Sequence, residues 1–274
     1  MGRYTVTDPV GRGGMGTIYR AVDSDGRRVA IKRLHDEIAS TPELATRFER
    51  EAAAQAMLDH PHIAALHAVG STPEGEVFLV MELVEGPSLA RRLESGPLPI
   101  GQALTLGGQV LRALHHAHQF GMVHRDLKPD NVLLATEGGQ LSAKVIDFGL
   151  VKLLQNILGP EHCERLTQTG MVFGTPSYMP PEQILGQPVD ARTDLYAMGI
   201  MLFEMLSGQL PYDSEEISEL WNMHLRAPIP SLRARVPAVS EDVDAIVTTL
   251  LAKAPAERFD SALAVARALE GARH

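Results

Sequence analysis

The chain has 274 residues, 45% of them hydrophobic and 22% charged, which is typical of a globular protein and excludes a disordered one. The formal net charge of −9 argues against nucleic-acid binding through phosphate neutralisation. The single cysteine, Cys163, excludes an internal disulfide and fits a reducing compartment. No signal peptide is expected, because the N-terminus has no apolar run, and no membrane segment is expected, because no uncharged apolar run reaches about 18 residues. We therefore expect a cytoplasmic chain, alone or as part of a longer, membrane-anchored protein.

Residues 4–34 alternate apolar and polar positions between glycine-containing turns, which predicts antiparallel strands at about 4–11, 17–23 and 28–34. Two further strands, a fourth and a fifth, are expected at about 66–71 and 76–83. Between the third and fourth, residues 42–58 take the helical period, with Pro42 at the first position. Residues 84–87 form a short break suited to a hinge.

Helical patterns dominate the rest of the chain. Helices are expected at about 88–94, 100–120, 190–208, 214–225, 241–252 and 260–270, and short strands at 131–134 and 143–146. The long irregular stretch 147–182 is more often functional than accidental. The sequence thus predicts an α+β fold with two lobes: a small antiparallel β lobe (1–84) with one key helix, and a larger, mainly α-helical lobe (85–274). The cleft between two such lobes is the natural site for a ligand.

A glycine-rich segment, G-R-G-G-M-G at residues 11–16, lies between the first two expected strands. Glycines allow a backbone to approach polyphosphate closely and leave its amides free to donate. A dinucleotide-binding fold would place this pattern at the start of a helix, so that interpretation fails here. A glycine-rich hairpin without a ligand remains an alternative.

The strand Val29-Ala30-Ile31-Lys32 turns Val29 and Ile31 to one face and Ala30 and Lys32 to the other. Ala30 is small enough to admit a flat ring, and Lys32 can reach phosphates from the same face. An ordinary surface lysine is the alternative.

The helix at 42–58 carries Glu51 on its apolar stripe, where an ionised carboxylate needs a partner. Lys32 is the obvious candidate, and a Lys32–Glu51 pair would hold the ammonium against α- and β-phosphates. A pair made by Glu49, or a solvated Glu51, is the alternative.

The segment H-R-D-L-K-P-D-N at residues 124–131 supplies the groups that phosphoryl transfer needs. Asp126 can accept the proton of an attacking hydroxyl, Lys128 is a cation near the transferred group, and Asn131 is an oxygen ligand for a metal. About twenty residues later, Asp147 precedes Phe148 and Gly149 at a strand end, a position suited to binding Mg²⁺. A plain turn would be the alternative for Asp147 alone.

Together these motifs resemble a eukaryotic-type (Hanks-type) serine/threonine protein kinase of the bacterial branch, from about Tyr4 to Leu269. The resemblance implies a single kinase domain over 1–274, with an activation segment at 147–182. It implies transfer of the ATP γ-phosphoryl group to Ser or Thr hydroxyls of protein substrates, with Mg²⁺ or, alternatively, Mn²⁺. Lys128 in D-L-K-P and Thr175 in G-T-P point to Ser/Thr rather than Tyr substrates.

The resemblance also implies roles for individual residues. Met81 would be the gatekeeper, the backbones of Glu82 and Val84 would bind adenine, and Leu133 would close the ring's other face. The complete ATP site implied is Val10, Gly11, Arg12, Gly13, Gly14, Met15, Gly16, Ile18, Ala30, Lys32, Glu51, Met81, Glu82, Val84 and Leu133. Asp194 would orient the catalytic loop, and Glu182 would pair with Arg258.

Arg125, beside the catalytic base, resembles part of a pocket for a phosphorylated activation loop, although a structural ion pair is the alternative. Thr167 and Thr169 are the candidate acceptors, by autophosphorylation in trans within a homodimer.

Two positions depart from the family pattern: Pro180 replaces the alanine of A-P-E, and Gln55 stands at an apolar position of the key helix. They give some support to a rival, a non-catalytic nucleotide-binding regulator. A pseudokinase or a small-molecule phosphotransferase fits the retained motifs less well. His115, His116 and His118 are expected only to decorate a helix.

Overall fold

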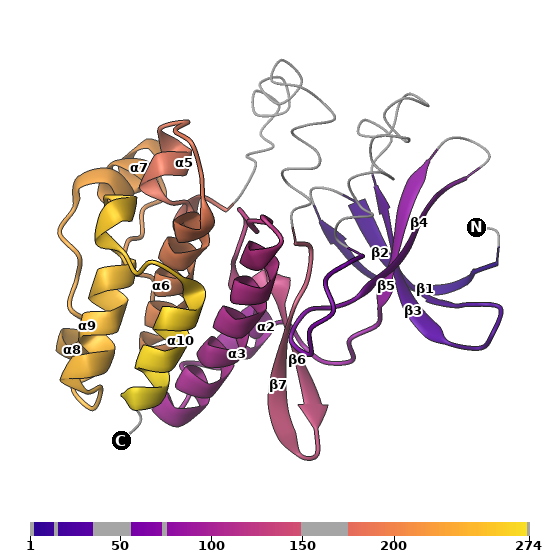
Figure 1. Ribbon diagram of the computed structural model, residues 1–274, viewed down its shortest axis with the longest axis horizontal. Helices are drawn as coiled ribbons and strands as arrows, with labels where there is room; N and C mark the ends of the chain where they lie inside the picture. The colour runs from indigo at the N-terminus through magenta and orange to yellow at the C-terminus, as the bar shows by residue number, and fades with distance from the viewer. Residues whose placement is uncertain (1–2, 14–15, 35–55, 73–75, 149–174, 273–274) are drawn as a thin grey trace. The chain divides into compact units, whose positions relative to one another are not determined.

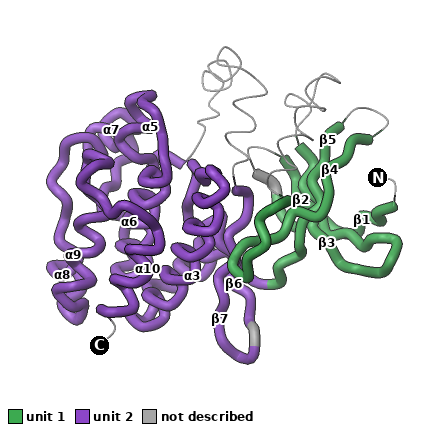
Figure 2. Tube along the Cα trace, in the orientation of Figure 1, with its two compact units in different colours: residues 1–85, 149–172 green, residues 86–148, 173–274 purple. Residues whose placement is uncertain are grey.

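The computed structural model describes residues 3–13, 16–34, 56–72, 76–148 and 175–272. These residues divide into two compact units, shown in separate colours in Figure 2. The first contains the described residues up to Glu85, and the second contains Gly86–Phe148 and the described residues from 175 onward.

The first unit is built on a five-stranded antiparallel sheet (Figure 1). Its strands are β1 (Thr5–Gly13), β2 (Gly16–Val22), β3 (Arg28–Leu34), β4 (Leu66–Ser71) and β5 (Val77–Glu82), in the order β1-β2-β3-β5-β4. Alternation along the strands sends one set of side chains into a small apolar core. That core contains Ala21, Val29, Ile31, Phe78 and Val80.

The second unit is mainly helical, as Figure 1 shows. Its helices are α2 (Leu89–Leu93), α3 (Ile100–Gln119), α5 (Pro181–Ile184), α6 (Ala191–Ser207), α7 (Ile217–Arg226), α8 (Leu232–Arg235), α9 (Glu241–Leu250) and α10 (Ala262–Gly271). Three 3₁₀ turns, η1 (Pro129–Asn131), η2 (Pro176–Tyr178) and η3 (Pro255–Glu257), lie between them.

Helix α6 is the buried centre of this unit, and it packs against α3 and α9. The Asp190 side chain caps its first turn by accepting a hydrogen bond from the Arg192 amide. Gly208, with φ of 71°, ends it in the left-handed conformation that glycine adopts most easily. A polar cap and a terminal glycine thus fix both ends of a helix whose interior is almost entirely apolar.

A two-stranded hairpin follows η1 in the second unit. Strands β6 (Val132–Glu137) and β7 (Gln140–Val145) pair antiparallel from Val132 opposite Val145 to Glu137 opposite Gln140. The two residues between them, Gly138 and Gly139, have φ of 57° and 80°. Positive φ at both central positions is the requirement of a type I′ turn, whose twist matches that of the strands it joins.

Most expected elements are present, with corrected limits. Strand β7 begins at Gln140 rather than at 143. Helix α7 begins at Ile217 rather than at 214, because the Ser214 hydroxyl accepts a hydrogen bond from the Glu216 amide and forms a turn there. The short α5 overlaps the last two residues of the stretch expected to be irregular and continues to Ile184, and the short α8 was not expected. The expected helix at 42–58 lies outside the described residues except for 56–58, where the chain is not helical.

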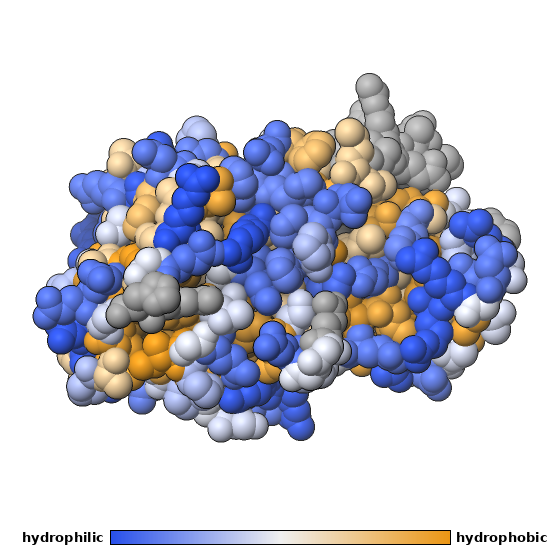
Figure 3. Space-filling model, turned by 60° about the horizontal axis from the view of Figure 1, so that its bottom comes forward, coloured by the Kyte–Doolittle hydropathy of each residue, from blue (hydrophilic) through white to orange (hydrophobic). Residues whose placement is uncertain are grey.

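The visible surface in Figure 3 is mainly hydrophilic, with apolar residues in separate patches. Exposed large apolar side chains include Met57, Phe120, Leu185 and Ile217. Scattered apolar residues of this kind are normal on a folded domain. Across the part of the chain that is described, no helix is both long and apolar enough to cross a membrane.

The close packing of α6 gives a stability prediction. A Cβ atom at Gly199 would lie 2.8 Å from the Leu250 Cβ and 3.1 Å from the Leu251 Cδ2. Overpacking of this kind costs about 1–3 kcal/mol, which outweighs the roughly 1 kcal/mol that alanine gains over glycine in a helix. We expect Gly199→Ala to lower the melting temperature by a few degrees in a thermal unfolding scan.

Gly101 on α3 is the matched control, because a Cβ atom there would meet nothing within 4 Å. Gly101→Ala is expected to leave the melting temperature unchanged or slightly higher. Equal losses in the two variants would contradict the packing argument.

Candidate active site

Three residues predicted from sequence, Lys128, Asn131 and Thr175, meet around Asp126. The Lys128 Nζ lies 3.2 Å from Asp126 Oδ2, and the Asn131 amide donates to the Asp126 backbone oxygen at 2.7 Å. The Thr175 backbone amide donates to Asp126 Oδ1 at 3.2 Å, and Lys128 donates to the Thr175 hydroxyl at 2.6 Å. Asp126 is thus an oriented carboxylate beside a cation, and its side chain keeps 12% exposure through which a hydroxyl can approach.

The backbone before Asp126 is held by a buried carboxylate on α6. Asp194 accepts hydrogen bonds from the His124 and Arg125 amides, both at 2.9 Å. Arg125 has φ of 68°, a left-handed conformation that costs a non-glycine residue roughly 1–2 kcal/mol. The pair of bonds to Asp194 offsets that cost and fixes the turn that presents Asp126. The contacts that the expected role of Asp194 requires are therefore present.

His118 belongs to the same arrangement, and the expectation that it only decorates a helix was wrong. Its Nε2 lies 2.8 Å from Asp194 Oδ2, and its side chain is 8% exposed. Burial by itself would raise the pKa of Asp194, but the hydrogen bond and charge of His118, with those of His124, hold the pKa below its usual value. The spacing of α3 placed His118 on a helix but gave no sign that Asp194, 76 residues later, lies beside it.

His124 connects the catalytic loop to the segment after β7. Its ring is fully buried, with Nε2 3.0 Å from the Ile146 backbone oxygen and Nδ1 accepting from the Asp126 amide at 3.3 Å. The ring also meets that of Phe148 edge to face, with centroids 4.9 Å apart. Asp147, which lies between Ile146 and Phe148 in the chain, has φ of 61°, so its backbone, like that of Arg125, is in the left-handed region. Strained backbone at two motif positions, Arg125 and Asp147, fits a functional site.

Asn131 and Asp147 lie at the same end of the β6–β7 hairpin. Val132 pairs with Val145, and the Ile146 amide donates to the Asn131 backbone oxygen at 3.0 Å. Because the Asn131 Nδ2 is engaged by Asp126, its amide oxygen is the atom suited to a metal. A carboxylate and an amide oxygen are ligands that fit a hard divalent cation such as Mg²⁺.

In the first unit, one face of the sheet gathers several of the expected ATP-binding residues. Ala30 lies opposite Met81, and Lys32 lies opposite Ile18. Directly paired residues in an antiparallel sheet share a face, and Val29 and Ile31 occupy the opposite, core face. Lys32 is only 5% exposed, which does not fit an ordinary surface lysine.

The glycines of the first motif serve different purposes. A Cβ atom at Gly16 would lie 2.1 Å from the Arg33 backbone oxygen, so the pairing of β2 with β3 itself requires glycine there. At Gly11 a Cβ atom would meet nothing within 4 Å, so packing does not explain that glycine. The expected role of Gly11 in phosphate binding stays a prediction.

Several expected residues lie outside the described part of the chain: Gly14, Met15, Glu51, Gln55, Thr167 and Thr169, together with the side chain of Arg12. The Lys32–Glu51 pair is therefore untested. Among the others, Val10 is exposed on β1, Gly13 ends that strand, Glu82 ends β5, Val84 follows it, and Leu133 lies on β6.

The predicted pair of Glu182 and Arg258 is confirmed. Two hydrogen bonds of 2.7 and 2.8 Å join them, and their side chains are 3% and 0% exposed. The Glu182 carboxylate also accepts a hydrogen bond from the Thr193 hydroxyl. The Arg258 guanidinium also donates to backbone oxygens, including that of Ala252 at 2.9 Å from Nε. Loss of one partner from such a buried pair is strongly destabilising, so α5 is firmly anchored.

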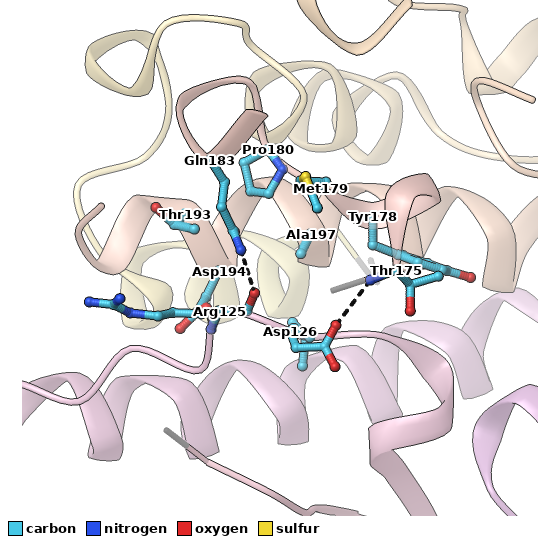
Figure 4. A pocket seen from close by; sticks show the side chains of 11 residues that line it. Arg125, Asp126, Thr175, Tyr178, Met179, Pro180, Gln183, Thr193, Asp194 and Ala197 are labelled. Atoms are coloured by element: carbon cyan, nitrogen blue, oxygen red, sulfur yellow. Dashed lines mark hydrogen bonds between the residues drawn. The ribbon is translucent and has the colours of Figure 1, made fainter. Parts of the chain in front are cut away.

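A small pocket lies between the catalytic loop, α5 and α6 (Figure 4). It is lined by Arg125, Asp126, Leu127, Thr175, Tyr178, Met179, Pro180, Gln183, Thr193, Asp194 and Ala197. Tyr178 donates to Glu204 at 2.5 Å, and burial, reinforced by the charge of Glu204, raises the pKa of Tyr178 well above its usual value. The tyrosine therefore stays a neutral donor in the pocket that Asp126 also lines.

Comparison with known proteins decides the family. A family profile described as "Protein kinase domain" matches residues 4–268. The chain belongs to the protein kinase family. This kinase chain is 39% identical to the serine/threonine-protein kinase pkn2 of Myxococcus xanthus, over 99% of its own length and 32% of that protein. It is 41% identical to the serine/threonine-protein kinase PksC of Streptomyces coelicolor, over 96% of its own length and 48% of that protein.

The solved kinase domain of Mycobacterium tuberculosis PknI matches 98% of this kinase chain and 96% of its own, with a TM-score of 0.74 and 30% identity. The expected protein-kinase fold of α+β class, with an antiparallel β part and a larger helical part, is thus confirmed. So is the expected class, a bacterial-type serine/threonine protein kinase. Kinases of this family act on protein substrates with ATP and a divalent metal. The chain spans about a third to a half of the curated relatives named here.

The contact between His118 and Asp194 gives a prediction for the kinase. We expect His118→Ala to lower kcat by about tenfold, corresponding to about 1.4 kcal/mol of lost positioning, with little change in KM for ATP. His118→Gln, which keeps a donor, should retain more activity. Steady-state phosphorylation of a generic protein substrate measures both constants.

His115→Ala, on the same helix, is the control and should leave both constants near those of the parent kinase. A His118→Ala variant with unchanged kcat would show that the two backbone amides hold Asp194 without help.

Proposed function

We propose that this chain is a single kinase domain over 1–274 that transfers the γ-phosphoryl group of ATP to Ser and Thr hydroxyls of proteins. The observation that carries the proposal is the cluster of Asp126, Lys128, Asn131 and Thr175, four groups of defined chemistry within direct hydrogen-bond distance. The lobes are proposed at 1–84 and 85–274, and the activation segment at 147–182.

Asp126 would accept the proton of the substrate hydroxyl while the hydroxyl oxygen forms a bond to the γ-phosphorus. The bond from that phosphorus to the bridging oxygen breaks, ADP leaves, and the proton passes from Asp126 to solvent. Lys128, 3.2 Å from the carboxylate, would stabilise charge on the transferred group. Thr175 would place the substrate, since its amide and hydroxyl both face this pair.

Asn131 and Asp147 would hold the metal, proposed as Mg²⁺ with Mn²⁺ as a substitute. A divalent ion held there would neutralise charge on the phosphates. On the first unit, the face carrying Ala30, Lys32 and Met81 would take the adenine ring and the inner phosphates. Glu51 would hold Lys32, the glycine segment would cover the phosphates, and Glu82, Val84 and Leu133 would border the base.

Transfer of ³²P from labelled ATP to a generic Ser/Thr substrate tests the proposal. We expect Asp126→Asn to reduce incorporation by at least about a thousandfold, since the amide cannot act as a base. Removal of divalent metal with EDTA should abolish incorporation, and added Mg²⁺ should restore it. A parent protein without activity, although it binds ATP, would instead support a nucleotide-binding regulator.

Autophosphorylation is proposed at Thr167 and Thr169, in trans within a homodimer in the cytoplasm. We expect Thr167→Ala with Thr169→Ala to remove most phosphate from the chain and to lower activity on other substrates. Mass spectrometry of the parent and double variant checks the sites. A catalytically dead Asp126→Asn chain, labelled when mixed with active chain, would establish reaction in trans, and unchanged activity of the double variant would contradict the role of these threonines.

A further inference from the structure

The turn before the catalytic base is held at two points, the amide and the carbonyl oxygen of Arg125. Arg125 has a left-handed backbone, with φ of 68°. Its amide donates to Asp194 on α6 at 2.9 Å. Its carbonyl oxygen accepts a hydrogen bond of 3.1 Å from Nε2 of Gln183, on α5 (Figure 4). If only its amide were held, the Arg125 carbonyl could still change direction. The hydrogen bond from Gln183 to the carbonyl oxygen restricts that rotation.

The chemistry of the contact fixes which end of the Gln183 amide faces Arg125. A carbonyl oxygen only accepts hydrogen bonds, so the amide nitrogen must face it; a flipped amide would put two acceptors together. The other end of the side chain, Oε1, is buried and has no hydrogen-bond partner within the described chain. The bond to Arg125 is therefore the interaction that fixes this side chain, at the expense of its own oxygen.

Gln183 links the segment that runs from Thr175 through α5 to the turn at Arg125 and Asp126. The residue before it, Glu182, is anchored through the buried pair with Arg258. Thr175, eight residues earlier on the same segment, contacts Asp126 itself through its backbone amide. The segment thus touches the catalytic turn on both sides of the bond between Arg125 and Asp126.

We propose that Gln183 is a positioning residue: from the segment 175–187, which the proposed function places at the protein substrate, it holds the Arg125 carbonyl and thereby sets the orientation of Asp126. It does not contact the reacting atoms; it acts through the peptide that carries the base. The base is then aligned only when the segment that receives the protein substrate is in place. This inference rests on the proposed kinase function.

A nearly isosteric substitution tests the donor directly. In Gln183→Glu, an ionised carboxylate cannot donate to the Arg125 oxygen, whereas the protonated acid can donate through its O–H. Burial beside a carbonyl oxygen raises the pKa of such a carboxylate, so protonation becomes accessible in mildly acidic buffer. We expect kcat about tenfold below the parent at about pH 8, with the ratio of variant to parent rising severalfold by about pH 6. KM for ATP should stay within about twofold.

Two further variants separate positioning from simple damage. Gln183→Met keeps the length but has no donor at any pH, so its kcat should stay about tenfold low throughout. Gln187→Glu is the matched control: it introduces the same charge on an exposed side chain of the same segment, and its ratio to the parent should be close to one and independent of pH. Thermal unfolding identifies any variant that is not folded.

The proposal is overturned if folded Gln183→Glu has a kcat, relative to the parent, that does not change with pH. It is also overturned if Gln187→Glu shows the same pH response. Normal kcat in Gln183→Met would overturn it as well, and this result stands even if the glutamate variant does not fold. The parent kinase and Asp126→Asn, assayed in parallel, show whether the chain is an active kinase at all. An inactive parent refutes the proposed function, whereas an active parent with an indifferent Gln183 refutes only the positioning role.

Discussion

The candidate site depends on one buried carboxylate. Asp194 lies within the most apolar helix of the second unit, almost fully buried, and accepts hydrogen bonds from two successive backbone amides and from His118. Without partners, a charge in that position would be very unfavourable. Two of those partners are the His124 and Arg125 amides, which belong to the turn with the left-handed backbone. The cost of burying the charge and the cost of the left-handed turn at Arg125 are thus offset by the same bonds.

Much of the architecture could be predicted from sequence, because local signals and packing agree there. The alternation at Val29–Lys32 fixes which side chains face the core, and the cap at Asp190 and the glycine at 208 delimit α6. The string at 124–131 predicted a cluster of Asp126, Lys128 and Asn131, and these side chains do lie together. Short elements such as α5 and α8 have too few residues to show a period, so they were not predicted.

What sequence could not show are contacts between distant segments. His118 and Asp194 are separated by 76 residues, and Gln183 and Arg125 by 58. Nothing in the local pattern of a helix marks which of three nearby histidines will meet a carboxylate from another helix. Such contacts follow from the packing of α3, α6 and the loop together, and packing is a property of the whole second unit. The predicted pair of Glu182 and Arg258 came from the family resemblance, not from spacing.

The Gly138-Gly139 turn has a consequence for the far end of its hairpin. A two-residue turn with positive φ at both positions fixes the pairing of β6 with β7, and that pairing brings Asn131 and Asp147 together at the other end. A shift of one residue would turn alternate side chains to the opposite face and separate the two residues proposed as oxygen ligands. Insertions are usually tolerated in exposed loops, but under the proposed metal site one added residue here, remote from every reacting group, is expected to lower metal affinity. The proposal therefore sets the length of this loop, although its two residues carry no side chains.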